Sequence, residues 1–233
     1  MPAMVAAGLQ KISLIDFPGR VSCVIFLTGC NFKCPYCHNP ELAQGQYTDR
    51  IPMQDLITFL DLRRSFLDGA VISGGEPTLH PDLDTLCRAV KDFGLDVKLD
   101  TNGSRPGAIA ALIRESLVDY IAMDLKTAPE HYAPDLCSEN VGSAVLESIK
   151  IIMDSGVDYE FRTTCVSPFV DTQRVQSMAL AVKGARRLVL QKFNSSKTLD
   201  SAYCQAAYRG LSHADMQSLR NRFLPLVASC TIR

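Results

Sequence analysis

Three cysteines of this chain, Cys30, Cys34 and Cys37, lie within eight residues at the spacing CxxxCxxC. Cysteine thiolates at this spacing can hold three corners of an iron–sulfur cube. The fourth iron would then lack a protein ligand and could bind a substrate or cofactor directly. A regular strand or helix would send the three side chains to different faces, so we expect a loop that wraps around the metal.

The same residues also match the sequence patterns of three other kinds of site. Cys34 and Cys37 form a CxxC pair of the thiol-redox type, which leaves Cys30 unexplained. With His38, the pair also matches the haem-attachment pattern CxxCH, which calls for export, and the N-terminal residues make a poor export signal. A structural zinc site of three cysteines and His38 is the strongest rival, but adjacent Cys37 and His38 rarely close on one ion. The spacing therefore favours an iron–sulfur cluster.

Length and composition limit the classes of protein to consider. The chain has 233 residues, of which 47% are hydrophobic, so we expect one domain over residues 1–233 with a single core. The net charge of -1 leaves no basic surface for nucleic acid or anionic lipid, and no apolar stretch approaches the roughly 20 residues that span a bilayer. The odd count of nine cysteines argues for a reducing compartment. We expect a cytoplasmic protein without nucleic-acid or membrane partners.

Apolar runs alternate with amphipathic stretches along the chain. The apolar pattern predicts strands over 21–27, 69–73, 95–100, 118–124, 159–165 and 187–191. Helices are predicted over 53–66, from Pro81 to Gly94, over 107–116, 143–154 and 171–182, and from about Ser212 onward. Six strands separated by helices predict an α/β fold with parallel pairing, either an open doubly wound sheet or a partial barrel.

Chemically unusual residues follow the predicted strands. In parallel α/β folds, ligands bind at the carboxyl ends of the strands. The cysteine loop, 74–77, 100–103 and the pair Asp124 and Lys126 all fall at such ends. Because Asp124 and Lys126 are two residues apart, they share one face of an extended backbone and suit a zwitterionic amino acid group. Taken alone, this pair is more often a salt bridge, and Gly74-Gly75 is more often a tight turn.

These motifs together resemble the radical S-adenosylmethionine (SAM) enzymes, and among them the activating enzymes of glycyl radical enzymes. The resemblance rests on CxxxCxxC, Gly-Gly-Glu-Pro, Asp-Thr-Asn-Gly and Asp-Leu-Lys after four successive strands. Tyr36 and the sequence Cys-His-Asn-Pro at 37–40 look like the pyruvate formate-lyase activase type. The most similar group is that of the anaerobic ribonucleoside-triphosphate reductase activating proteins. The resemblance implies a partial (β/α)6 parallel barrel of the radical SAM type.

The resemblance also implies a role for each matching residue. Cys30, Cys34 and Cys37 would ligate a [4Fe-4S] cluster whose open iron chelates the methionine end of SAM. Further contacts with SAM would come from Gly74, Gly75, Glu76, Pro77, Asp100, Thr101, Asn102, Asp124, Lys126, Arg162, Thr164 and Gln191. In some activases, the residues matching Asp100 and Thr101 help to bind a monovalent cation. No side chain is needed as a general base, since the cofactors supply the radical chemistry.

The implied reaction begins with one electron from a low-potential donor such as flavodoxin or ferredoxin. Reductive cleavage of SAM gives methionine and a 5′-deoxyadenosyl radical, which takes a hydrogen atom from a glycine of the partner glycyl radical enzyme. Two alternatives remain open at this stage: a radical SAM enzyme acting on a small molecule such as a deazaguanine precursor, and a zinc or thiol-redox protein.

The remaining cysteines and histidines have simpler interpretations. Cys23, Cys87 and Cys165 fall at core positions and are interpreted as small buried hydrophobic residues. Cys137, Cys204 and Cys230 lie too far apart to suggest a second cluster. His80, His131 and His213 stand alone in the sequence and are interpreted as structural or exposed.

Overall fold

The structure is a computed structural model that describes residues 5–47, 50–194, 198–200 and 211–233. The chain forms two compact units. The first consists of Met1–Asn31, Glu41–Thr101 and Gly107–Ile121, and the second of Phe32–Pro40, Asn102–Pro106 and Ala122–Arg233. Within the described residues, no helix is both long and apolar enough to cross a bilayer.

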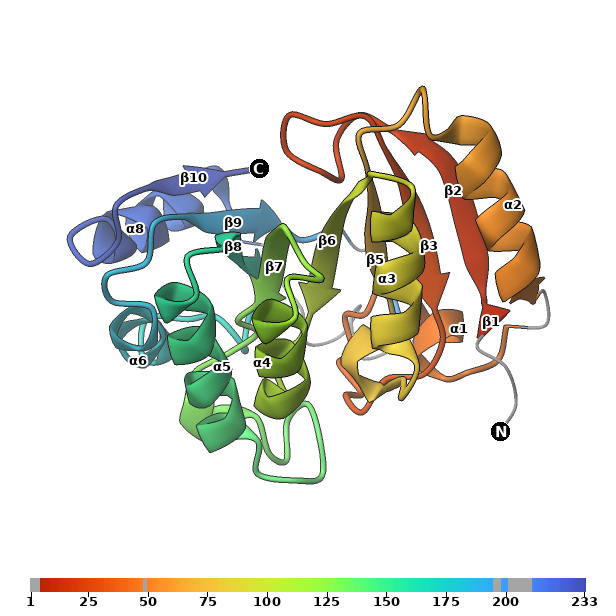
Figure 1. The fold of residues 1–233 in the computed structure, drawn as a ribbon. Helices are drawn as coiled ribbons and strands as arrows, with labels where there is room; N and C mark the ends of the chain where they lie inside the picture. The colour runs from red at the N-terminus through yellow and green to blue at the C-terminus, as the bar shows by residue number, and fades with distance from the viewer. Residues whose placement is uncertain (1–4, 48–49, 195–197, 201–210) are drawn as a thin grey trace. The chain divides into compact units, whose positions relative to one another are not determined.

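The first unit carries the N-terminal strands and their helices (Figure 1). Its elements are β1 (Val5–Ala6), β2 (Gly8–Ser13), β3 (Ser22–Leu27), α1 (Pro40–Ala43), β4 (Ile51–Pro52), α2 (Met53–Arg63), β5 (Gly69–Gly74), the 3-10 turn η1 (Pro77–Leu79), α3 (Leu83–Asp92), β6 (Asp96–Thr101) and α4 (Pro106–Arg114). Strand β7 (Tyr120–Asp124) passes from this unit into the second.

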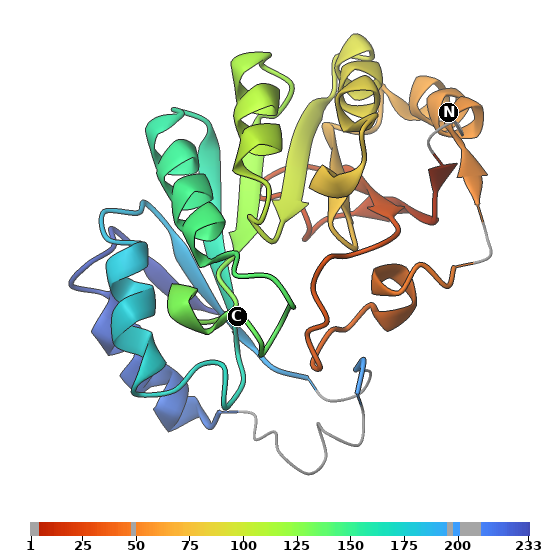
Figure 2. The ribbon, with the colours of Figure 1, turned by 90° about the horizontal axis from the view of Figure 1, so that it is seen from below.

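Parallel pairing aligns the carboxyl ends of the strands in the first unit. The order is β2-β3-β5-β6, in which β2 is antiparallel to β3 and the other pairs are parallel. Leu27 pairs with Gly74, so β3 and β5 end side by side and their following loops begin at one edge. Helices α3 and α4 lie on one side of these strands (Figure 2). The core contains buried residues such as Ile72, Leu86 and Leu99.

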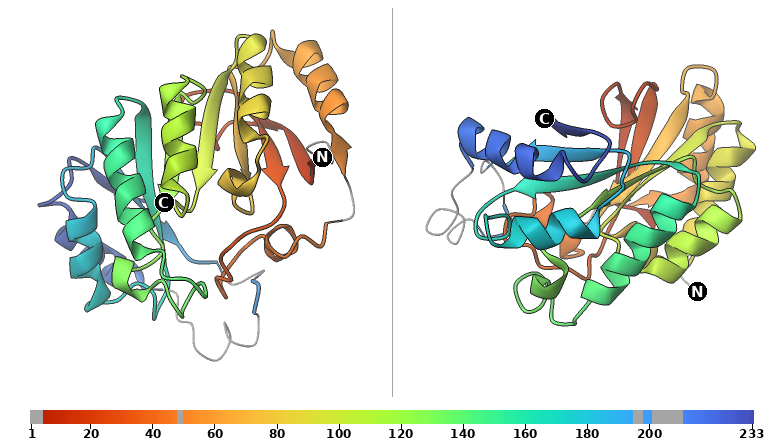
Figure 3. Two further views of the ribbon diagram at one scale, coloured as in Figure 1. Left: turned by 60° about the horizontal axis from the view of Figure 1, so that its bottom comes forward. Right: turned by 90° about the vertical axis from the view of Figure 1, so that its left-hand side faces the viewer.

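The second unit repeats the alternation of helices and parallel strands. After β7, its elements are the 3-10 turn η2 (Pro129–His131), α5 (Gly142–Asp154), β8 (Asp158–Cys165), α6 (Arg174–Ala181), β9 (Leu188–Lys192), α8 (His213–Phe223) and β10 (Cys230–Ile232). The strand order is β7-β8-β9-β10, and β9 is parallel to both β8 and β10. Helices α6 and α8 pack against each other, and α8 also packs against β10 (Figure 3).

The predicted alternation is confirmed, with element ends that differ by at most three residues. Each of the six predicted strands is present, as β3 and β5 to β9. The last helix begins where Ser212 caps it, with the Ser212 side chain accepting from the Asp215 backbone in a capping box. Strands β2 and β10 were not predicted. Strand β2 lies at a sheet edge and has three consecutive exposed residues, and β10 has only three residues. Neither strand therefore carries the buried apolar run by which strands were predicted.

Candidate cofactor-binding residues at the strand ends

The cysteine segment is an irregular loop between β3 and α1, as predicted. In the first unit, α1 holds the start of this loop through two backbone hydrogen bonds. Gly29 N donates to Leu42 O at 2.7 Å, and Cys30 N donates to Ala43 O at 3.0 Å. The loop is therefore anchored on its N-terminal side by backbone contacts that do not involve the thiol groups.

Two aromatic side chains anchor the remainder of the loop in the second unit. Phe32 and Tyr36 are buried, and their rings lie 5.6 Å from Tyr132 and 5.1 Å from Phe169. Around Tyr36, Cys37 N donates to Cys34 O at 3.0 Å and closes a tight turn. Burial of two rings beside the cysteines fixes the backbone of the CxxC segment.

The thiols of the loop have the chemistry that a cluster requires. Cys30, Cys34 and Cys37 form no disulfide; Cys34 is buried and the other two are partly exposed. Cys30 belongs to the first unit and the other two to the second. The described residues include no preformed group of three or more His, Cys, Asp or Glu that could hold a metal ion. Cluster ligation thus stays a prediction, supported by the position of three thiols on one loop.

His38 has contacts of its own in the second unit. Its Nε2 lies 2.8 Å from Asn194 O, and its ring stacks on Phe193 with centroids 6.0 Å apart. One ring nitrogen is thus engaged by a backbone carbonyl, which weakens the zinc alternative that uses His38 as the fourth ligand.

Gly74, which ends β5, and Gly75, which follows it, are required by the backbone beside them. Gly74 has φ +119°, and a Cβ there would lie 2.1 Å from Leu27 O. A Cβ on Gly75 would lie 2.0 Å from Gly29 O. Gly75 N donates to Leu27 O, and Glu76 N donates to Gly29 O, each at 2.8 Å. The glycine loop therefore supports the residues directly before Cys30, because only glycine permits so close an approach.

Glu76 joins two of the motif loops within the first unit. Its side chain is fully buried, and Oε1 accepts from Thr78 N at 3.1 Å and from Thr101 Oγ1 at 2.7 Å. Pro77 begins the turn η1 that Glu76 caps. The carboxylate thus ties the loop after β5 to the end of β6, which gives this side chain a structural role.

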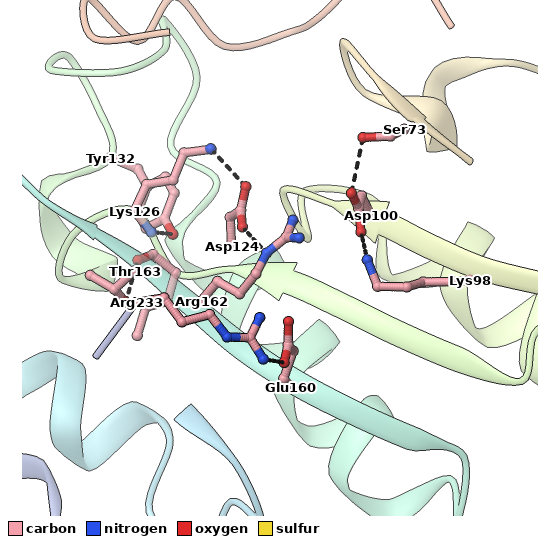
Figure 4. A network of polar contacts seen from close by, with 11 residues as sticks. Ser73, Lys98, Asp100, Asp124, Lys126, Tyr132, Glu160, Arg162, Thr163 and Arg233 are labelled. Carbon is pink, nitrogen blue, oxygen red and sulfur yellow. Dashed lines mark hydrogen bonds and ion pairs between the residues drawn. The ribbon is translucent and has the colours of Figure 1, made fainter. Parts of the chain in front are cut away.

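Asp100 lies in a polar cluster on β5 and β6 (Figure 4). Ser73 Oγ donates to Asp100 Oδ2 at 3.0 Å, while Lys98 forms an ion pair with Asp100 Oδ1. The Lys98 side chain is only 2% exposed and that of Asp100 17%. Residues two apart on a strand share a face, which places this ammonium beside its carboxylate.

The second unit brings together Asp124 at the end of β7, Lys126 just after it and Arg162 of β8 (Figure 4). Asp124 Oδ2 lies 3.2 Å from Lys126 Nζ, and Asp124 Oδ1 accepts from Arg162 Nε at 2.8 Å. Burial alone would raise the pKa of Asp124, but the two cations outweigh it and lower the pKa to about 2. Asp124 is therefore a carboxylate at every physiological pH.

The other predicted contacts lie at strand ends as well. Thr164 of β8 is the register partner of Gln191 of β9, so these side chains come from adjacent strands. Asn102 is buried, and its Oδ1 accepts from Ser104 N at 2.9 Å, which closes the turn after β6. Asn102 thus shapes the loop that follows Asp100 and Thr101.

Two side chains beside these residues were not predicted. Tyr132 OH accepts from Lys126 N at 3.1 Å, and burial raises the pKa of this phenol, which therefore stays protonated. Nothing in the sequence around Tyr132 marks it. Lys98 did carry a signal: it is a charged residue within a buried strand, two positions before Asp100.

The cysteines predicted to be core residues are confirmed as such. Cys23, Cys87 and Cys165 have no exposed surface, and burial raises the pKa of each thiol to about 12. Cys137 and Cys230 are also buried, and Cys204 lies outside the described residues. The buried thiols stay protonated and inert.

Comparisons with known proteins agree with this geometry. The family model described as "Radical SAM superfamily" matches residues 24–181. A Methanocaldococcus jannaschii protein named "Putative glycyl-radical enzyme activating enzyme" is 36% identical over 212 residues, covering 87% of this chain and 85% of the relative. The pyruvate formate-lyase-activating enzyme of Clostridium pasteurianum is 25% identical over 190 residues, covering 78% of this chain and 77% of that enzyme.

A solved structure with the same fold is that of SuiB from Streptococcus suis, bound to its precursor peptide SuiA. Its TM-score is 0.66 at 13% identity, with 90% of this chain and 48% of that chain covered, so this chain spans about half of SuiB. At this identity the likeness concerns the fold alone. It confirms the predicted fold class, an α/β protein with parallel strands of the type that the sequence motifs implied.

Proposed function

The chain belongs to the radical SAM superfamily, and we propose that it activates a glycyl radical enzyme. Membership makes it an enzyme that acts by radical chemistry, and the family implies a [4Fe-4S] cluster and SAM. The observation that carries the finer proposal is the 36% identity to a relative with an activating-enzyme name over 87% of this chain. The second activase relative, at 25% identity over 78% of the chain, supports the same assignment.

The residues at the strand ends fit these cofactors. Cys30, Cys34 and Cys37 would hold the cluster, because they are three thiols on one irregular loop that backbone hydrogen bonds and buried aromatic rings hold in place. When bound and reduced, the cluster supplies the electron that cleaves SAM into methionine and a 5′-deoxyadenosyl radical. What the chain itself contributes is the position of the cofactors and the exclusion of water from them.

The charged group of the second unit suits the methionine end of SAM. Lys126 offers an ammonium for its carboxylate, and Asp124 offers a carboxylate for its amino group. Arg162 secures the Asp124 side chain from the neighbouring strand. The further contacts with SAM would come from Gly74, Gly75, Glu76, Pro77, Asp100, Thr101, Asn102, Thr164 and Gln191. Glu76 would contribute through its backbone, since its carboxylate is engaged.

We propose anaerobic ribonucleoside-triphosphate reductase as the partner whose glycine loses a hydrogen atom. A low-potential protein such as flavodoxin or ferredoxin would deliver the electron. Residues 1–233 would act as one radical SAM domain, and the substrate would be a polypeptide loop of the partner.

The proposal is tested by electron paramagnetic resonance under anoxia. The reconstituted chain, SAM, a reductant and the candidate reductase should together give the doublet signal of a glycyl radical. A reductase variant with that glycine changed to alanine is the matched control and should give no doublet. If 5′-deoxyadenosine accumulates but every glycyl radical enzyme tested stays silent, the activase proposal fails. A small-molecule substrate such as a deazaguanine precursor is then favoured.

A further inference from the structure

We propose that the Lys98 ammonium is a built-in cation for Asp100, in the place that the family resemblance assigns to a bound monovalent cation. The inference rests on the proposed function for the role of Asp100 beside SAM. It predicts that this chain binds SAM without sodium or potassium ions.

Lys98 is buried within β6. Its side chain is 2% exposed on the central part of β6, between Val97 and Leu99, which are fully buried. A lysine is almost never buried so completely unless its charge is compensated. Within the described residues, Asp100 is the carboxylate that forms an ion pair with Lys98. Both members of the pair belong to this strand.

The oxygen atoms of Asp100 and Thr101, which would have to ligate a cation, already have partners in the chain. Asp100 Oδ1 faces the Lys98 ammonium, and Asp100 Oδ2 accepts from Ser73 Oγ at 3.0 Å. Thr101 Oγ1 donates its hydrogen to Glu76 Oε1 at 2.7 Å, which directs this hydroxyl toward the buried glutamate. A monovalent ion bound at Asp100 would have to share the carboxylate with an ammonium whose like charge repels it. The residues present therefore do not fit a bound monovalent cation.

The electrostatic consequence concerns SAM itself. SAM carries a positive sulfonium, and Asp100, near the end of β6, is among the residues proposed to contact SAM. Without Lys98, the partly buried carboxylate would recruit a cation from solution to balance its charge. With Lys98, that balance is supplied by the chain at any salt composition. The identity of residue 98 would thereby decide whether the site depends on alkali ions.

The first test measures SAM affinity of the cluster-loaded protein at constant ionic strength, with tetramethylammonium replaced stepwise by sodium or potassium. The SAM affinity of the wild type should change less than about twofold. In Lys98→Met, affinity in tetramethylammonium should fall about tenfold and return when either alkali ion is added, a typical size for coupling between two ligands. Lys150→Met, which removes an exposed lysine of α5, is the matched control and should behave as wild type.

A second test needs neither SAM nor turnover. Thermal unfolding of the protein without SAM should be insensitive to alkali ions in wild type. In Lys98→Met, the melting temperature should rise with sodium or potassium, because an ion that binds only the folded state stabilises it. If Lys98→Met does not fold, Lys98→Gln replaces it, since glutamine can still donate a hydrogen bond to Asp100.

Three results would overturn the inference: a wild type whose SAM affinity rises tenfold or more with sodium or potassium, a Lys98 variant unaffected in both tests, or a variant weakened irrecoverably. The unfolding test also separates this inference from the proposed function. Absence of a glycyl radical would refute the function and leave the unfolding comparison intact, whereas a cation-dependent wild type would refute the role of Lys98 alone.

Discussion

Asp124 shows how a single carboxylate is prepared for a charged ligand. It is paired with Lys126 on its own strand end and with Arg162 on the next strand. Two cations facing one carboxylate leave a net positive charge, which favours the carboxylate of an amino acid ligand. Taken alone in the sequence, the pair of Asp124 and Lys126 is more often a salt bridge. The third member, Arg162, makes the site more than a neutral pair.

Changing Lys126 to Ala should weaken SAM binding about tenfold or more, because one charge-assisted contact to the SAM carboxylate is lost. Iron content should stay the same, since Lys126 does not touch the thiols in the proposed arrangement. Equilibrium dialysis with SAM and an iron assay on the same sample measure both. Unchanged affinity would reduce Asp124 and Lys126 to a structural ion pair.

Replacing Cys30, Cys34 or Cys37 singly by Ala should abolish the cluster and all cleavage of SAM, because two thiolates do not retain the cube. Absorption spectra and iron and sulfide assays after anaerobic reconstitution give the answer. Cys87→Ala is the control: its thiol is buried on α3 with a pKa of about 12, so its loss should leave the iron content unchanged. A variant of the loop that keeps its iron would contradict the ligand assignment.

The pH dependence of Asp124 follows from its lowered pKa. Its folded-state value of about 2 lies below the ordinary value near 4, so its stabilising effect is complete above about pH 4 and lost as the pH falls toward 2. The difference in unfolding free energy between wild type and Asp124→Asn should be about 2 kcal/mol and constant from pH 8 to 5. Urea unfolding at several pH values measures it. A difference that already shrinks between pH 7 and 5 would contradict this account.

At the scale of elements, parallel register explains why the motif loops begin together. Leu27 and Gly74 end β3 and β5 as direct register partners. The next two residues, Gly75 and Glu76, donate backbone hydrogen bonds to Leu27 O and Gly29 O, directly before Cys30. Any displacement of the loop after β5 is therefore transmitted to the residue before Cys30. The glycines matter as much for holding this loop as for approaching a ligand.

Gly75→Ala should disturb the cysteine loop, because the added Cβ would lie 2.0 Å from Gly29 O, and backbone cannot move aside as a flexible side chain can. We expect a loss of about 1–3 kcal/mol in unfolding free energy together with a lower cluster content. Gly107→Ala, in the first turn of α4 with open space around it, should be neutral or stabilising by up to about 1 kcal/mol. Urea unfolding and iron assays on both variants compare them; equal behaviour would show that the contact does not constrain the loop.

Burial determined which helices and strands could be predicted from the sequence. The strands β3, β5 and β7 carry continuous apolar runs, and their ends carry the motifs, so both were visible in the sequence. The edge strand β2 was hidden because its exposed residues Gln10 to Ile12 give no buried pattern. The anchoring of the cysteine loop by Phe32 and Tyr36 was also hidden, since a contact with Tyr132 or Phe169 leaves no local trace.

For the whole molecule, spacing and motif order were sufficient to indicate the superfamily, and the comparisons confirm it. The sequence could not show which side chains of the fold would pair with the buried or partly buried carboxylates. Glu76, which is predicted to contact SAM, has its carboxylate bound internally. Asp100, whose counterpart in some activases helps to bind a monovalent cation, forms an ion pair with Lys98. Both facts depend on which side chains neighbouring strands bring together.

The claim that this chain activates a glycyl radical enzyme is tested most directly by following the hydrogen atom that leaves the glycine of the partner. The candidate reductase is produced with deuterium on the Cα of its glycines and incubated with the reduced, cluster-loaded chain and SAM. The account predicts that 5′-deoxyadenosine recovered from the mixture carries deuterium, as measured by mass spectrometry. 5′-Deoxyadenosine that forms with the partner present but carries no deuterium would contradict it.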